Sequence, residues 1–353
     1  MQITLLAFDW FFLIEKLVLI IGIVSVSLVI AMYETYAERK VAAFIQDRIG
    51  PNRAGPFGIF QPLADGMKLF MKEEIIPNTS NRMLFILGPC LAMLTAMMTS
   101  AVIPWGGTLD FFGRQVPLQI TDINIGILYI FGVVSMGVYG IMIGGWASNN
   151  KFSLLAALRG ASQVISYELP MGLSLIALLM VTGSLKMSTI VGGQLDSMYN
   201  VLYQPLGFFI FLVCAFAECN RTPFDLPEAE NELNFGYHQE YSSMKLGFYL
   251  FAEYINMFIS SVIMATLFFG GYDIPFVNDH KLVESIGQNW TAVLEGLTLF
   301  VKTAGFIFLF MWVRWTIPRF RYDQLMNLCW KRLIPLALAN MLITAAVVLW
   351  LKK

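Results

Sequence analysis

The chain has 353 residues, of which 57% are hydrophobic and only 13% charged, with a net charge of −1 and a mean hydropathy of +0.67. A soluble protein carries about 25% charged residues, so this composition excludes an ordinary soluble domain and indicates an integral membrane protein. The near-zero charge indicates no nucleic acid or other polyanion as partner. The four cysteines form no C-x-x-C pair and there are only two histidines, so we expect no metal, haem or iron–sulfur site in this chain.

Eight apolar stretches are each long enough to cross a hydrocarbon core of roughly 30 Å as a helix of about 20 residues. They cover approximately 9–33, 82–104, 123–147, 161–183, 201–219, 246–271, 291–313 and 333–351. The alternation typical of a barrel is absent, and lipid-exposed backbone must satisfy its own hydrogen bonds. We therefore expect an all-α integral membrane protein forming one polytopic domain over 1–353. No cleavage site follows Lys16, so the first span is expected to be retained.

The distribution of cations predicts the orientation. The four connecting segments on one side are the loops at about 34–81, 148–160, 220–245 and 314–332. Of the 23 Lys and Arg residues, 16 lie in these loops or at their edges, and five lie on the opposite side. The positive-inside rule then places the four loops in the cytoplasm and both termini on the outer, periplasmic side.

The first loop is expected to contain an amphipathic helix after the first span. Ile59, Leu63, Met67 and Phe70 fall on one helical face, which is typical of a helix lying in the membrane interface. Such a helix could serve only as an anchor, or it could form one wall of an opening for a lipid-soluble substrate.

Three acids lie within or at the end of predicted spans, namely Glu168, Glu218 and Glu253. A carboxylate at that depth costs several kcal/mol unless it is paired, hydrated or protonated. Each could simply make a hydrogen bond between packed helices, worth about 0.6 kcal/mol on average. Three together favour a functional role.

The stretch FAECNRTPFDLPEAENELNFGYHQEY carries six carboxylates and one cation, Arg221, on the side where cations are expected. Asp225, Glu228, Glu230 and Glu232 are so closely spaced that they are expected to raise one another's pKa and titrate as a group. A solvated loop would explain the polarity alone. A hydrated pocket that collects protons would also explain the flanking apolar runs and the two prolines.

The last loop, VRWTIPRFRYDQLMNLCWKR, alternates arginines with aromatic residues. Arginines next to a span commonly set the orientation and contact lipid headgroups. Arg314, Arg319 and Arg321 could equally pair with acids from a neighbouring loop or subunit.

Four segments resemble one known family. ERKVAAFIQDRIGPNRAGPFGIFQPLADGMKLF, RGASQVISYELP, AECNRTPFDLPEAENELNFGYHQEY and PRFRYDQLM are similar to signatures of the H subunit of bacterial NADH:quinone oxidoreductase. This enzyme is respiratory complex I, and the mitochondrial counterpart of the H subunit is the first NADH dehydrogenase chain. The resemblance covers essentially the whole chain in order. The charged motif positions agree, and Cys219 stands where the family often has Thr.

The resemblance implies a non-redox subunit of a proton-translocating enzyme in the bacterial plasma (inner) membrane. It would bind no cofactor, with quinone as the substrate and with FMN and iron–sulfur clusters in partner subunits. Its partners would be the quinone-site and iron–sulfur peripheral subunits, the small membrane subunits, the antiporter-like subunits and membrane lipids. No residue of this chain would be catalytic.

The resemblance also implies two sets of site residues. The residues expected to line a quinone-access tunnel are Glu38, Arg39, Arg48, Arg221, Asp225 and Arg314. Those expected to couple quinone reduction to proton transfer are Glu168, Glu218, Glu228, Glu230, Glu232, Glu240 and Glu253.

Two other functions stay open at this point. A membrane-anchor subunit of a related energy-converting hydrogenase would need no quinone tunnel, although related hydrogenase subunits resemble the GPNRAGPFGIFQPLADGMKLF segment less closely. A free-standing ion transporter would be expected to show inverted repeats and paired broken helices, which are not found in this sequence.

Overall fold

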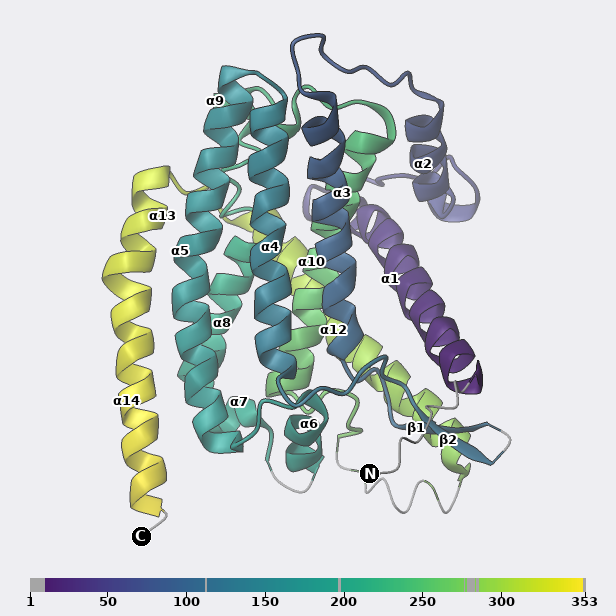
Figure 1. Cartoon of the computed structure of the whole chain (residues 1–353), viewed down its shortest axis with the longest axis vertical. Helices are drawn as coiled ribbons and strands as arrows, with labels where there is room; N and C mark the ends of the chain where they lie inside the picture. Colours follow the sequence, from purple (N-terminus) through teal and green to yellow (C-terminus); the bar gives the residue numbers. More distant parts are fainter. Residues whose placement is uncertain are drawn as a thin grey trace, which may run out of the picture.

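The computed structural model describes residues 10–111, 113–195, 198–275, 277, 283 and 286–351 (Figure 1). Within these residues the chain is helical apart from one antiparallel hairpin, β1 (Thr108–Phe111) with β2 (Arg114–Pro117), which confirms the all-α class. The helices are α1 (Trp10–Ile45), α2 (Gln61–Met71), α3 (Arg82–Met98), α4 (Gly126–Ala147), α5 (Lys151–Thr182), α6 (Met187–Leu195), α7 (Asn200–Tyr203), α8 (Pro205–Glu218), α9 (Glu230–Leu233), α10 (Ser243–Phe268), α12 (Gln288–Thr316), α13 (Tyr322–Leu328) and α14 (Ile334–Leu351). Single 3-10 turns lie at Pro56–Gly58, Thr99–Val102 and Gly236–His238, and a π turn, Cys329–Leu333, joins α13 to α14.

Seven helices in the described part of the chain are long and apolar enough to cross a membrane. They are α1, α3 with its following turn, α4, α5, α10, α12, and α13 continued through α14. The predicted span at 201–219 is instead divided, because α7 ends at Tyr203 and Pro205 begins α8 at the position where a proline is best tolerated. Helix α8 has 14 residues, about 21 Å of helix, which is shorter than the hydrocarbon core. The predicted count of eight spans is therefore not confirmed.

Helices reach into all four predicted loops, and the last loop, 314–332, also contains α13. Helix α1 continues to Ile45, since no helix breaker occurs before Gly50-Pro51. Helix α5 starts at Lys151, where the Asn150 side chain accepts a hydrogen bond from the Phe152 amide (3.0 Å) and caps the helix. The amphipathic stretch of the first loop forms α2; its position in a membrane interface stays a prediction.

Helix α10 forms the centre of the bundle and α1 lies at its margin. In α10, 72% of the apolar stretch is buried, against 6% in α1. Small residues let the inner helices approach closely. A Cβ on Gly140 of α4 would come within 2.9 Å of the backbone nitrogen of Ala92 in α3, so a larger residue there would push these helices apart.

The two ends of the bundle differ in composition. The hairpin and α6 lie at one end, together with the start of α1 and the end of α14 (Figure 1). Helices α2 and α9 lie at the opposite end (Figure 1), as do the segments that connect α1 to α2, α8 to α10 and α12 to α13. We call this opposite end the charged end, because these connections carry most of the charged residues singled out in the sequence.

Candidate functional site

Glu38 gathers charged and polar groups from three helices at the charged end. Its carboxylate is buried in α1, and Nη1 of Arg314 in α12 lies 2.6 Å from its Oε1. The Tyr254 hydroxyl of α10 donates to its Oε2 at 3.0 Å, and Nη1 of Arg221 lies 3.9 Å from the same oxygen. These four residues, Glu38, Arg221, Tyr254 and Arg314, are called the Glu38 cluster below. One carboxylate thus faces two guanidinium groups.

Arg221 is held inside the protein by the turn that follows α8. It is 4% exposed, and its guanidinium carbon lies 4.2 Å from the centre of the Tyr254 ring, which is a cation–π contact. Gln163 of α5 fixes the turn, because its amide donates to the carbonyl oxygens of Ala217 (2.8 Å) and Phe224 (2.7 Å). Nε and Nη2 of Arg221 have no hydrogen-bond partner among the described residues. These two buried donors are therefore unsatisfied within the described part of the chain.

Asp225 connects this turn to the segment between α12 and α13. Its carboxylate is buried, and Oδ2 lies 2.7 Å from Nη2 of Arg319. The Phe320 amide also donates to the Pro223 carbonyl oxygen at 3.1 Å. Burial and the negative charge of Glu228 raise the pKa of Asp225 to about 7, against the opposite effect of Arg319. Asp225 can therefore change its charge near neutral pH.

Glu228 and Glu253 form a carboxyl pair. Each carboxyl group acts on the charge of the other, and two carboxyl groups can share a hydrogen bond only when one of them holds a proton. Burial would raise the pKa of Glu228, but His238, the neighbouring Glu253 and the charge of Arg221 together lower it. Glu228 is thus the member of the pair that ionises more readily.

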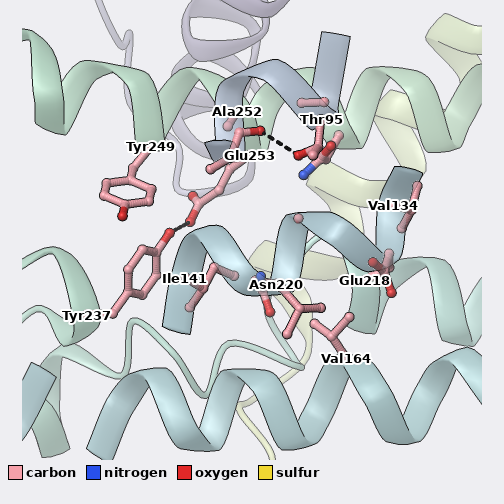
Figure 2. A pocket seen from close by; sticks show the side chains of 15 residues that line it. Thr95, Val134, Ile141, Val164, Glu218, Asn220, Tyr237, Tyr249, Ala252 and Glu253 are labelled. Carbon is pink, nitrogen blue, oxygen red and sulfur yellow. Dashed lines mark hydrogen bonds between the residues drawn. The ribbon is translucent and has the colours of Figure 1, made fainter. Parts of the chain in front are cut away.

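Tyr237 supports the same pair from the other side. Its hydroxyl donates to Oε1 of Glu253 at 3.0 Å (Figure 2). Burial and the neighbouring Glu253 raise the pKa of Tyr237 well above its usual value, so this hydroxyl keeps its proton. The hydroxyl is therefore a permanent donor to a carboxyl group that can exchange its own proton.

A cavity of about 40 Å³ lies between α3, α4, α5 and α10. Most of its wall is apolar, but Glu218, Asn220, Tyr237, Tyr249 and Glu253 also line it. Glu253 and Glu218 lie on opposite sides of the view, with Asn220 between them (Figure 2). Since a water needs roughly 10–15 Å³ of such volume, this central cavity has room for about three waters.

Glu168 extends this row of acids beyond the central cavity. It is an electrostatic neighbour of Glu218, and its side chain lies beside Ser135 of α4. One oxygen of Glu168 and one of Glu218 have no hydrogen-bond partner among the described residues. Unpartnered buried carboxyl oxygens at this depth indicate groups that bind protons or contact water.

A second pocket, of about 280 Å³, opens between α1, α2 and α10. Its wall is mostly apolar and also contains Arg39, Asp65 and Tyr254. Nη1 of Arg39 lies 2.6 Å from Oδ2 of Asp65, which ties α1 to α2. Tyr254 belongs both to the wall of this side pocket and to the Glu38 cluster, so the pocket ends against the charged groups.

Eight of the 13 predicted site residues lie in one buried network. Those in the buried network at the charged end or around the central cavity are Glu38, Arg221, Asp225, Arg314, Glu168, Glu218, Glu228 and Glu253. Arg39 lines the side pocket, and Arg48 lies outside the network, beside Gln46 (2.9 Å).

Three predicted coupling acids are placed differently. Glu232 is 60% exposed and pairs with Arg159 at 2.8 Å. Glu240 accepts a hydrogen bond from the Asn150 amide at 2.7 Å, and the side chain of Glu230 lies outside the described residues. These three are not brought into the buried network by any contact of the described residues.

Four members of the site are absent from the two predicted sets of site residues, namely Tyr237, Tyr254, Arg319 and Glu34. Tyr237 and Tyr254 are two of 13 tyrosines and show no distinctive pattern. Arg319 is recognisable in the sequence only as one cation of the last loop. Glu34 does have a signal, because it precedes Glu38 by one helical turn and must share its face.

Taken together, the fold and the site define a class, a polytopic helical membrane protein with a buried network of carboxylates and arginines at one end. The NADH dehydrogenase family matches residues 17–345 of the chain. Curated relatives include an H subunit of the NADH-quinone oxidoreductase of Cytophaga hutchinsonii, 65% identical over 340 residues that cover 96% of this chain and 98% of the relative. The H subunit of the Flavobacterium johnsoniae enzyme is 64% identical, with 96% of each chain covered, and that of Thermomicrobium roseum is 47% identical, with 97% and 98% covered.

The chain belongs to the family of H subunits of NADH-quinone oxidoreductase, the membrane subunits of bacterial complex I. It is thus a multi-pass membrane protein and one part of a multi-subunit enzyme. The resemblance seen in the sequence is confirmed.

Proposed function

We propose that this subunit forms a wall of the chamber through which a quinone reaches its reduction site, and that its buried carboxyl groups couple this reaction to proton transfer. The observation that carries the proposal is the position of Tyr254. Its ring lines the side pocket, and its hydroxyl contacts Glu38 at 3.0 Å. A lipid-soluble ligand in the pocket would therefore meet the start of the charged network.

The side pocket has the chemistry that a quinone requires. Its apolar wall suits an isoprenoid tail, while the guanidinium of Arg39 offers donors to the carbonyl oxygens of a headgroup. Reduction of a quinone to a quinol takes up two electrons and two protons. The electrons would come from FMN through iron–sulfur centres, all of them in partner subunits. This chain would bind no cofactor. It would position the quinone and supply charged groups beside it.

The carboxyl groups supply the coupling. Moving one proton against about 150 mV costs roughly 3.5 kcal/mol, which equals a change of about 2.5 pKa units. Buried acids that face one another respond strongly to a nearby charge change. The proposed route runs from the Glu38 cluster through Glu228 and Glu253, across the central cavity to Glu218 and Glu168, and on towards antiporter-like subunits.

The orientation belongs to the same proposal. The cations of the charged end favour placing that end in the cytoplasm, with both termini on the periplasmic side. Cysteine labelling from each side of intact cells would test it. A charged-end cysteine should react only with a permeant reagent.

Glu218→Gln tests the coupling. The glutamine keeps the shape and cannot exchange a proton, so proton pumping and quinone reductase activity should fall together. NADH oxidation by an artificial acceptor, which bypasses the membrane subunits, should stay at the wild-type rate and report assembly. Wild-type pumping in a fully assembled variant complex would refute the assignment of Glu218.

A further inference from the structure

Glu34 is a buried acid on the inward face of α1, one helical turn before Glu38. It is 3% exposed, and neither of its carboxyl oxygens has a hydrogen-bond partner among the described residues. An ionised carboxylate in such surroundings is costly. Glu34 therefore needs either a proton or a cation to compensate its charge.

The cation that acts on Glu34 is Arg221, which lies 3.9 Å from Glu38, one helical turn further along α1. It has unused capacity, because Nε and Nη2 have no acceptor among the described residues. Its one ion-pair contact in the Glu38 cluster is the long one to Glu38, 3.9 Å, while Arg314 holds that carboxylate at 2.6 Å. An acid without donors thus lies near a guanidinium with spare donors.

We propose that Glu34 binds a proton when a quinone headgroup occupies the spare donors of Arg221, so that ligand binding and proton uptake are linked at this pair. The proposal deepens the proposed function and rests on it. Without a ligand, the positive charge of Arg221 favours the ionised form of Glu34. When a carbonyl oxygen of the headgroup accepts from Nε or Nη2, the guanidinium is shared, and the carboxylate takes one proton from water to become a carboxylic acid. No bond of the quinone changes in this step.

Other ionisable groups surround the pair and must be considered with it. They are Glu38 on α1, Cys219, Asp225 and Glu228 in the segment after α8, Glu253 and Tyr254 on α10, and Arg314 on α12. On α2, Asp65 is engaged with Arg39. Glu38 already has a guanidinium and a hydroxyl as partners, so its charge is fixed more firmly than that of Glu34.

The test is the pH dependence of KM for a short-tailed quinone, measured on the assembled complex in membranes at saturating NADH. If binding takes up one proton, KM rises with pH by up to about tenfold per pH unit once free Glu34 is ionised. Glu34→Gln resembles the protonated acid, so its KM should stay at the low-pH value over the whole range. A purely structural role would instead raise KM equally at every pH.

Two further variants keep the test decisive. Glu34→Asp retains an acid in a shorter side chain and should shift the pH at which KM begins to rise. This variant can be measured even if the Glu34→Gln complex does not assemble. Glu15→Gln removes a carboxylate near the other end of the same helix, where it pairs with Lys16, and should keep the wild-type profile. A Glu34→Gln complex with the wild-type slope, or a Glu34→Asp complex with an unshifted profile, would overturn the linkage.

Arg221→Gln separates this proposal from the proposed function. A raised KM in this variant together with a wild-type slope in Glu34→Gln would leave the quinone chamber standing and remove only the linkage. An unchanged KM in Arg221→Gln would remove the quinone contact itself. NADH oxidation by an artificial acceptor reports assembly in each case.

Discussion

Nη1 of Arg314 lies 2.6 Å from Oε1 of Glu38, so the charged ends of α12 and α1 are joined through a carboxylate that also faces Arg221. The Glu38 side chain is only 8% exposed and that of Arg314 is 24% exposed. An ion pair this buried does not necessarily stabilise the fold, but breaking it leaves an uncompensated charge. The pair is therefore better understood as a fixed point of the site than as a source of stability.

Glu38→Gln should damage the site more than its size suggests. The glutamine side chain still accepts the hydrogen bond from Tyr254, but Arg221 and Arg314 lose the negative charge that lies between them. Loss of one partner of a buried pair costs about 3–5 kcal/mol, and partial exposure of Arg314 places this case at the lower end. We expect kcat/KM for quinone to fall at least about tenfold, with artificial-acceptor NADH oxidation unchanged. Glu38→Asp should retain part of the activity; wild-type kinetics in Glu38→Gln would contradict the role of the cluster.

Asp65→Asn should change entry of the substrate without changing stability. The Arg39–Asp65 pair is half exposed on the arginine side, and such pairs contribute about 0–1 kcal/mol. The pair nevertheless ties α2 to α1 at the side pocket. We expect KM for a long-tailed quinone to rise several-fold with kcat unchanged, since substrate binding and not chemistry is affected.

Lys68→Gln is the matched control for this prediction. Lys68 is exposed on α2 and does not line the side pocket, so its loss also removes one charge from the same helix. Its KM should equal that of the wild type. Equal effects in the two variants would attribute the change to the loss of a charge from α2 and not to the pocket.

The long helices could be predicted from hydropathy alone, because a span needs only length and low charge. The interruption before Pro205 was missed, although a proline disfavours the helical conformation at the residue before it. Gln204 also donates to Thr344 (2.8 Å) and accepts from Asn340 (3.1 Å). These contacts between distant segments hold the Gln204 side chain against α14, and no local pattern reveals them.

The site, like the fold, could be predicted from the sequence only in part. The residue types and the resemblance identified Glu38, Asp225 and Arg314, but the pairing of Asp225 with Arg319 depends on how two connecting segments cross. Which acids of the acidic stretch are buried could not be predicted from the sequence either. Glu228 is enclosed whereas Glu232, four residues later, is 60% exposed, because only the fold decides which side of the segment faces α10.

Asp225 should make the charged end less stable locally as pH rises. Its folded pKa is about 7, against an ordinary value near 3.9 when a local opening exposes it to water. Between these values the closed state holds a proton that the open state releases, so opening becomes more favourable by up to about tenfold per pH unit and levels off above about pH 7. Hydrogen exchange of the segment around Arg319, corrected for intrinsic rates, should show this rise. Asp225→Asn should remove it; the same rise in the variant would assign it to another group.

Gly144→Ala tests whether close helix packing positions the central cavity. A Cβ at Gly144 of α4 would overlap the hydroxyl of Tyr249, which donates to the Gly140 carbonyl oxygen at 3.1 Å and lines the cavity. Overpacking of this kind costs about 1–3 kcal/mol, so the variant should lower the Tm of the purified complex and reduce proton pumping. Gly132→Ala, on the same helix with nothing within 4 Å of the new Cβ, should keep the wild-type Tm or raise it, because alanine is the better helix former. Equal Tm values in the two variants would show that Tyr249 can move aside, and that its position does not depend on the glycine.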